Sequence, residues 1–300
     1  MKPPAFDYVA VSSIDQALAE LAHHGDDAKI LAGGQSLMPI LNMRLAGPAK
    51  LVDLNRIGTL SYIAEHDGGV AVGAMTRQRA AEQSVLIASR VPLLAEALPW
   101  IGHSAIRNRG TVGGSIAHAD PAAELPAVAL CLDARLTIAG TAGSRTMPAA
   151  EFFRGSLQTA LAATEILLEA WFPSPQPASG WAWLEFSRRH GDYALAGVAA
   201  MVALDGAVVR EARLALIGVE AMPFRAVEAE RLLAGAPLTS ESLAAAADSV
   251  RRRADPPADV HASAAYRRHL ASVLTSRALG LAAERARRAW TEVHGDTRPS

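Results

Sequence analysis

Three prolines stand within five residues in the middle part of this 300-residue chain. They are Pro173, Pro175 and Pro177, and the segment that holds them ends at Gly180. Because proline fixes φ and has no backbone N–H, this segment cannot continue a helix or a central strand. We therefore expect a linker here, between a first domain at 1–176 and a second at 177–290, with a tail at 291–300. A length of 300 residues also suits two domains.

Composition and charge limit the class of protein. Half of the residues are hydrophobic and a fifth are charged, which is typical of globular domains. A net charge of -1 gives no basic field, so we expect no nucleic-acid partner. Cys131 is the only cysteine, which excludes a disulfide framework and any iron–sulfur cluster held by this chain alone. No apolar stretch is long enough to span a bilayer and no signal segment is evident, so we expect a cytoplasmic protein without membrane insertion.

The region before the linker divides into two predicted subdomains. In residues 1–57, strands at 6–9, 29–31 and 50–54 alternate with helices that follow Ser13 and that cover 37–45. This is a βαβ subdomain. Residues 58–176 predict an α+β subdomain, with strands at 60–64, 70–73, 135–139 and 166–172 and helices at 77–87, 91–98 and 122–132.

The region after the linker predicts a smaller α+β domain. Its three strands are expected at 181–188, 194–204 and 208–217, with Asp205 and Gly206 forming a hairpin turn, and its helices at 228–233, 240–251 and 264–289. The predicted fold class is therefore α+β, with a two-subdomain first domain followed by a three-stranded antiparallel sheet with helices. Arginines along the last helix form either a solvated face or a docking surface for partner subunits.

A glycine pair, Gly33 and Gly34, stands where a predicted strand meets a predicted helix. Glycines at such a turn allow successive backbone N–H groups to point at one anion, and the helix adds its positive end. Ser36 could donate to a phosphate oxygen and Lys29 could add charge. The alternative is a tight strand-to-helix turn that binds no ligand.

A second glycine-rich segment contains Gly110, Gly113 and Gly114, and could let a flat or extended ligand lie on the backbone. Asp120 could cap the following helix, and the surroundings of His118 lack the spacing of a metal site. Neither glycine segment fits the dinucleotide or P-loop motif, and no nucleophile elbow is present. A bound organic cofactor that brings its own reactivity is the better explanation.

Both segments resemble those of a known family. Residues 30–39, ILAGGQSLMP, are similar to the first FAD-pyrophosphate segment of the FAD-binding medium subunits of molybdenum hydroxylases, a family that includes carbon monoxide dehydrogenase medium chains and the flavin domain of xanthine dehydrogenase. Residues 106–115, IRNRGTVGGS, resemble the second segment. Matches at 120–126, 185–189 and 192–196 extend the resemblance over about residues 3–285.

The resemblance implies FAD as the cofactor and suggests which residues bind it. The expected set is Lys29, Ile30, Leu31, Ala32, Gly33, Gly34, Gln35, Ser36 and Leu37 around the diphosphate, Ile101 and Gly102 beside the flavin or ribityl chain, Thr111, Gly114 and Ser115 as hydrogen-bonding groups, Asp120 and Glu124 at ribityl or ribose hydroxyls, Leu167 on a strand against a ring system, and Tyr193 as a lid over the isoalloxazine. No side chain is expected to be catalytic or to bind a metal.

The resemblance also implies a function within a larger complex. The chain would be an oxidoreductase subunit that takes electrons from a small subunit with two [2Fe-2S] clusters and passes them through flavin to an external acceptor. A large molybdopterin-binding subunit would oxidise the substrate. Two alternatives stay open at this point: a stand-alone FAD-dependent oxidase, and an assembly factor that has lost the flavin.

Overall fold

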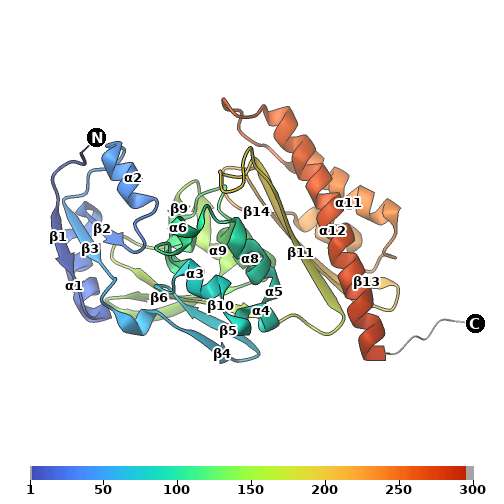
Figure 1. Ribbon diagram of the computed structural model, residues 1–300, viewed down its shortest axis with the longest axis horizontal. Helices are drawn as coiled ribbons and strands as arrows, with labels where there is room; N and C mark the ends of the chain where they lie inside the picture. The colour runs from blue at the N-terminus through green and yellow to red at the C-terminus, as the bar shows by residue number, and fades with distance from the viewer. Residues whose placement is uncertain (1, 295–300) are drawn as a thin grey trace, which may run out of the picture.

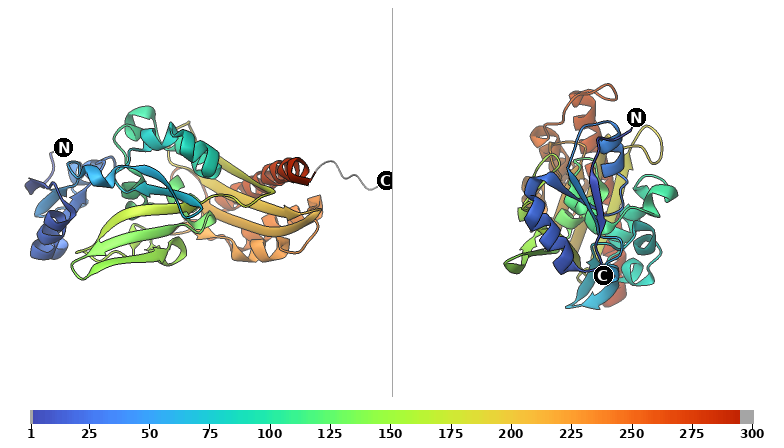
Figure 2. Two further views of the ribbon diagram at one scale, coloured as in Figure 1. Left: turned by 90° about the horizontal axis from the view of Figure 1, so that it is seen from below. Right: turned by 90° about the vertical axis from the view of Figure 1, so that its left-hand side faces the viewer.

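The computed structural model describes residues 2–294 and shows three main sheets, one after another along the long axis of the molecule (Figure 1; Figure 2, left). The first is a parallel sheet with strand order β1-β3-β2. The second has five strands in the order β4-β5-β10-β6-β7, and the third has four in the order β11-β12-β13-β14. All ladders of the second and third sheets are antiparallel, which confirms the predicted α+β class.

The first sheet follows the predicted order of elements. These are β1 (Asp7–Ala10), α1 (Ile14–His24), η1 (Gly25–Asp27), β2 (Ala28–Leu31), α2 (Leu37–Asn42) and β3 (Lys50–Asp53). The Ser13 side chain caps α1 by accepting from the Gln16 N–H, and Gly25 ends it with φ of 54°. Helix α2 ends at Asn42 instead of residue 45, because Arg44 turns the chain into the left-handed region with φ of 59°.

The second sheet and the segments around it depart from prediction. Its strands and the small hairpin beside it are η2 (Gly58–Leu60), β4 (Ile63–His66), β5 (Gly69–Gly73), β6 (Arg135–Gly140), β7 (Gly143–Pro148), β8 (Phe153–Gly155), β9 (Gln158–Thr159) and β10 (Ile166–Pro173). The hairpin of β8 and β9 was not predicted. The strand predicted at 60–64 is wrong in its bounds, since a 3-10 turn occupies its start. Strand β7 was not predicted because it is an exposed edge strand with one buried residue, Met147. The helix predicted at 77–87 is two helices, because Ser84 caps a new one by accepting from the Ile87 N–H.

Short helices cover this sheet and fill the space beside the third. They are α3 (Gln78–Glu82), α4 (Val85–Arg90), α5 (Pro92–Ala97), η3 (Leu98–Trp100), α6 (Ser104–Arg107), α7 (Val112–His118), α8 (Glu124–Cys131) and α9 (Ala149–Phe152). Every residue of α8 is buried, and the helix contacts β12 and β13 as well as α5 and α7. The core of the middle region therefore continues into the third sheet. Cys131 lies in this core, where burial raises the pKa of its thiol, so its role is packing.

The third sheet consists of β11 (Ser179–Phe186), β12 (Ala196–Asp205), β13 (Val208–Ile217) and the two-residue β14 (Phe224–Arg225), which was not predicted. Helices α10 (Val227–Leu233), α11 (Ser240–Arg253) and α12 (Ala264–His294) pack with it, and α12 lies across β11 and β12 (Figure 1). The last helix extends past residue 289 into the predicted tail, whose remaining residues 295–300 lie outside the described part of the chain.

The arginines of α12 do not form one uniform face. Arg267 is buried and donates to the Leu195 and Gly218 carbonyls, at 2.8 and 3.3 Å. Arg285 joins Glu96 of α5, so it ties α12 to the middle region. These two arginines therefore form contacts within the protein. A solvated face, which is the commoner arrangement for arginines along a helix, does not describe them. Among residues 2–294, no helix combines the length and the apolar character needed to cross a bilayer.

Candidate functional site

The turn after β2 presents a row of unpaired backbone donors. Within residues 2–294, the N–H groups of residues 33–36 donate to no backbone or side-chain acceptor. Gly34 has φ of 74°, a conformation that favours glycine, and the Gln35 side chain donates to the Gly33 carbonyl at 3.0 Å. The Ser36 side chain precedes α2 without capping it. Successive free N–H groups of this kind form a concave anion-binding site.

The second glycine segment packs directly against this turn. A Cβ placed on Gly33 would overlap the Arg109 carbonyl oxygen and lie 2.7 Å from the Gly110 Cα. A Cβ on Gly114 would lie 3.3 Å from the Ala32 Cβ. The two segments, 76 residues apart at Gly33 and Arg109, therefore meet backbone against backbone. Only residues without side chains permit that approach.

The donors of the second segment are already used. The Gly113 N–H donates to the Ala74 carbonyl at 2.9 Å, the Gly114 N–H to the Thr111 Oγ1 at 3.1 Å, and the Ser115 N–H to the Thr111 carbonyl at 3.2 Å. The first segment thus supplies the free N–H groups, while the second supplies backbone packed against them, and the Thr111 hydroxyl is buried and caps α7. The contacts that the sequence predicted for Thr111, Gly114 and Ser115 stay predictions.

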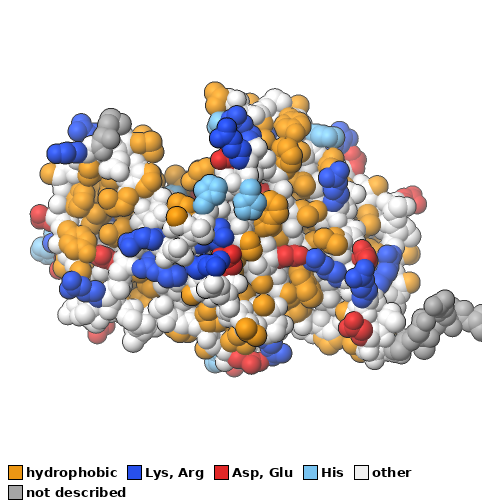
Figure 3. Space-filling view, viewed as in Figure 1, with side chains coloured by type: hydrophobic (Ala, Val, Ile, Leu, Met, Phe, Trp, Pro, Cys, Tyr) orange, Lys and Arg blue, Asp and Glu red, His pale blue; other side chains and the backbone are white. Residues whose placement is uncertain are grey.

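Positive charge surrounds the two segments. Burial lowers the pKa of the Arg77 guanidinium, and the nearby Arg109 lowers it further, so these two cations lie close together. For Asp53 beside them, burial acts to raise the pKa, but hydrogen bonds from Tyr8 and Asn55 and the charge of Arg109 outweigh it and lower the pKa. In Figure 3, Lys and Arg side chains gather in a band below a hollow in the upper edge of the molecule. A ligand with two negative charges suits such a site.

The predicted turn at Ile101 and Gly102 is held by an arginine that sequence reasoning missed. Arg107 is buried and donates to the Ile101 carbonyl at 2.9 Å and to the Gly102 carbonyl at 3.2 Å. It also forms two hydrogen bonds with Glu82, at 2.9 and 3.2 Å, and the hydrogen bond from Arg107 is the main cause of the lowered pKa of Glu82. No local pattern distinguishes Arg107, because its partners lie in another helix and in a turn.

A group of carboxyls lies where the middle region meets the third sheet. Glu124 at the start of α8 is 8% exposed, and Glu185 on β11 is 9% exposed. Burial raises the pKa of both carboxyls, and the charge of Glu124 raises that of Glu185 further. Asp120 accepts from the Ala122 N–H at 2.8 Å, within the turn before α8. The predicted capping role is wrong, because α8 begins at Glu124 after Ala123 and no side chain caps it. Tyr193 is 70% exposed, and both Asp120 and Glu124 lie near enough to act on its hydroxyl.

The structure brings several of the predicted residues into contact. Gly33 meets Arg109 and Gly110, and Ala32 meets Gly114. A Cβ at Gly191 would lie 3.0 Å from the Gly102 carbonyl oxygen, so the segment before Tyr193 approaches the Ile101 turn. Strand β10 connects to the second glycine segment through Ala74, which donates to the Leu168 carbonyl and accepts from Gly113. The Leu167 side chain, however, is buried in the core, and Lys29 is exposed on β2. Their contacts with a cofactor stay predictions.

The buried pair of carboxyls predicts a pH-dependent stability. Because the raised pKa values mean that the folded protein binds these protons more tightly than the unfolded chain, the free energy of unfolding falls as pH rises above the ordinary value of 4.5. Glu185→Gln removes one of the two titrations. We expect the variant and the wild type to have the same urea midpoint near pH 5. At pH 8 the variant should have the higher midpoint, and its free energy of unfolding should be larger by at least about 1.4 kcal/mol.

The exposed Glu292 provides the control for this measurement, since Glu292→Gln should leave the curve unchanged at both pH values. A Glu185→Gln protein that follows the wild-type curve from pH 5 to pH 9 would mean that the Glu185 carboxyl is ionised throughout.

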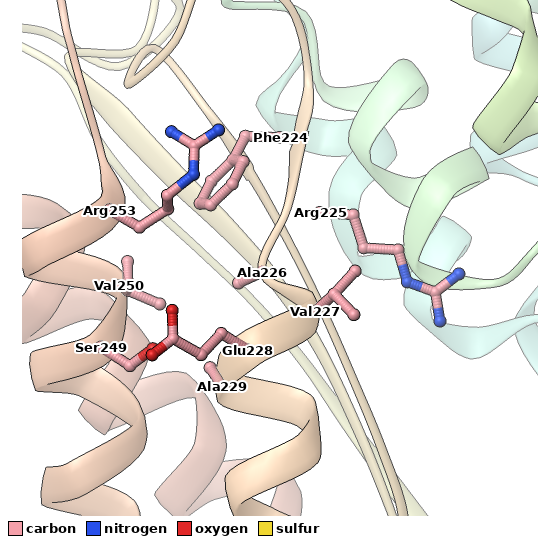
Figure 4. A pocket seen from close by; sticks show the side chains of 9 residues that line it. All are labelled: Phe224, Arg225, Ala226, Val227, Glu228, Ala229, Ser249, Val250 and Arg253. Atoms are coloured by element: carbon pink, nitrogen blue, oxygen red, sulfur yellow. The ribbon is translucent and has the colours of Figure 1, made fainter.

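A cavity elsewhere is distinct from this site. It measures about 180 Å³ and lies between β14, α10 and α11, with Arg253 over the Phe224 ring and Arg225 pointing away (Figure 4). None of its lining residues belongs to the glycine segments. In the described part of the chain, no group of three or more His, Cys, Asp or Glu side chains could hold a metal ion.

Comparisons with known proteins agree with this geometry. Residues 4–175 match the family described as the FAD binding domain in molybdopterin dehydrogenase, and residues 181–282 match the CO dehydrogenase flavoprotein C-terminal domain. The 6-hydroxypseudooxynicotine dehydrogenase complex subunit alpha of Paenarthrobacter nicotinovorans is 45% identical over 96% of this chain and 97% of its own length. Caffeine dehydrogenase subunit beta of Pseudomonas sp. (strain CBB1) is 40% identical over 95% and 97%.

A solved structure shows the same fold over nearly the whole chain. It is a chain of carbon monoxide dehydrogenase from Hydrogenophaga pseudoflava, with a TM-score of 0.93, 40% identity, and coverage of 95% of this chain and 99% of that one. The free N–H groups, the touching glycine segments and these matches lead to one conclusion: the chain belongs to the FAD-binding medium-subunit family of the molybdenum hydroxylases, together with the carbon monoxide dehydrogenase medium chains.

Proposed function

We propose that this chain is the FAD-carrying electron-transfer subunit of a heteromeric molybdenum-containing hydroxylase. The observation that carries the proposal is the row of free N–H groups at residues 33–36, packed against a second glycine segment and close to two arginines. A diphosphate that joins two ring systems fits this arrangement, since it needs several donors and two compensating charges. In such a subunit FAD supplies the redox chemistry, because it takes up and releases electrons.

The residues of the chain then bind and orient the cofactor. We propose that residues 29–37 hold the diphosphate, that Thr111 and Ser115 contribute hydroxyls, and that the turn at 101–102 lies beside the flavin or ribityl chain. Asp120 and Glu124 would accept from cofactor hydroxyls, and Tyr193, which is exposed and close to both, would cover the ring. The division into domains at 1–176, with subdomains 1–57 and 58–176, and 177–290 belongs to the same proposal.

Electrons must reach the cofactor from another chain. A [2Fe-2S] cluster is held by four cysteine thiolates, and this sequence has one cysteine, which is buried in the core. We therefore propose a partner subunit with two [2Fe-2S] clusters and a large molybdopterin-binding subunit that oxidises the substrate. The relative from Paenarthrobacter nicotinovorans is likewise named as one subunit of a dehydrogenase complex. A cytoplasmic location is part of this proposal.

Ligand titration of the purified chain tests the cofactor assignment. FAD added to the apo-protein should bind one to one and give the absorbance of a yellow flavoprotein. Riboflavin lacks the diphosphate, so we expect it to bind at least about 100-fold more weakly. Equal affinity for riboflavin and FAD, or no binding of either, would overturn the assignment. Substrate oxidation by the chain alone would instead favour a stand-alone oxidase.

A further inference from the structure

Asn55 and Arg77 connect the two glycine segments without belonging to either. Asn55 follows β3, and its Nδ2 donates to the Ala32 carbonyl at 2.8 Å, at the start of the first segment. Its Oδ1 accepts from the Arg77 Nη2 at 2.7 Å. The Arg77 Nη1 in turn donates to the Arg109 carbonyl, at the start of the second segment. One chain of side-chain hydrogen bonds thus runs from the first segment to the second.

Backbone contacts fix the Arg77 end of this chain. Arg77 forms an isolated antiparallel bridge with Thr111, and the Gln78 N–H donates to the Gly110 carbonyl at 2.9 Å. The backbone of Arg77 is therefore attached to the second segment, and its guanidinium extends from this fixed position. Because its donors form a planar fork, one group can satisfy the Arg109 carbonyl and the Asn55 amide together.

Asp53 fixes the Asn55 end. Its Oδ1 accepts from the Asn55 N–H at 2.8 Å and from the Asn55 Nδ2 at 2.5 Å, and its Oδ2 accepts from the Tyr8 hydroxyl at 2.6 Å. The lowered pKa of Asp53 keeps this carboxylate ionised at neutral pH. Asn55 is thereby oriented with its amide nitrogen toward Ala32 and its oxygen toward Arg77.

We propose that Asn55 and Arg77 form a clamp that sets the spacing of the two glycine segments and so determines how tightly the protein binds a diphosphate-containing cofactor. Both are positioning residues. The inference rests on the proposed FAD function, since it adds the residues that preassemble the FAD site. Packing of Gly33 against Arg109 and Gly110, and of Ala32 against Gly114, brings the segments together. The clamp adds directional hydrogen bonds to the Ala32 and Arg109 carbonyls, which fix the orientation of one segment relative to the other.

Titration of the full-length apo-protein with FAD tests the clamp. Arg77→Gln and Asn55→Ala should each weaken FAD binding by about 10- to 100-fold, the range expected for losing hydrogen bonds of a charged group. Arg77→Lys can reach one of the two acceptors at a time and should bind with intermediate affinity. Amide hydrogen exchange of residues 110–115, whose N–H groups are hydrogen-bonded, should accelerate in the apo-variants relative to wild type, while exchange in β12 and β13 stays unchanged.

Arg79→Gln is the matched control, because Arg79 lies two residues after Arg77, in α3, but pairs with Glu82, which Arg107 also holds. It should bind FAD like the wild type. The Asn55→Ala and Arg77→Gln double variant should be little worse than either single variant, since both break the same chain of hydrogen bonds. Wild-type affinity in both single variants would overturn the clamp while leaving the FAD assignment intact. Failure of the wild type itself to bind FAD would overturn the assignment instead.

Discussion

Gly33→Ala is expected to reduce FAD affinity by at least about 100-fold. The new Cβ would overlap the Arg109 carbonyl oxygen and stand 2.7 Å from the Gly110 Cα, and both are backbone atoms that cannot rotate away. Since carbon atoms pack at about 3.5–4.0 Å, the two segments must move apart by about 1 Å. A displacement of that size ruins the alignment of a preorganised site. Fluorescence titration of the apo-protein with FAD measures the loss.

Gly58→Ala is the control for this substitution. A Cβ on Gly58 would meet no atom within 4 Å, and its φ lies outside the left-handed region. The variant should fold and bind FAD as the wild type does. If Gly33→Ala kept wild-type affinity for FAD, the close approach of the two segments would have no part in binding, and the proposed site would be wrong.

Gly180→Ala is expected to destabilise the protein by about 2–4 kcal/mol. Gly180 lies on β11 beneath α12, and a Cβ there would overlap the Ala282 carbonyl oxygen and the Ala286 backbone nitrogen and lie 2.8 Å from the Arg285 Cβ. Helix and strand would have to separate where the two are in closest contact. Arg285 also donates to the Trp181 carbonyl and pairs with Glu96 of α5, so the separation would loosen the attachment of α12 to the middle region.

The comparison for this variant lies on the same helix. Gly280 in α12 has open space where a side chain would project, so Gly280→Ala should stabilise the protein by about 0.5–1 kcal/mol through better helix propensity. Thermal and urea unfolding of both variants provide the measurement. Opposite signs of the two effects are the expected result, and equal effects would mean that the β11–α12 contact is looser than the structure indicates.

Local patterns were sufficient for much of the fold. The capping of α1 by Ser13, its end at Gly25 and the hairpin at Gly206 are decided by neighbours within a few residues, so the sequence carries their signals. Elements without such signals escaped prediction. Strand β7 is an exposed edge strand, and β14 has only two residues. Neither therefore has the alternating hydrophobic pattern by which a strand is predicted.

The candidate site shows the same division. Glycines at 33–34 and 113–114 indicated backbone close to a ligand, and the resemblance of both segments to a known family identified that ligand as FAD. The sequence did not indicate Arg107, which holds the Ile101 turn, or the chain from Asn55 through Arg77 to Arg109. These side chains act on carbonyl groups, which every residue possesses, so nothing in the sequence marks their partners.

The amino-acid sequence alone determined where the chain turns and which segments are rich in glycine. Through its family, it also determined which cofactor the chain carries. The tertiary structure decided that the free donors belong to the first glycine segment, that Gly33 touches Arg109, and that Glu124 and Glu185 share one buried region. The physical reason is separation along the chain. Hydrogen bonds and burial within one turn or strand follow from adjacent residues. Contacts between residues that are distant in the sequence depend on how the whole intervening chain folds.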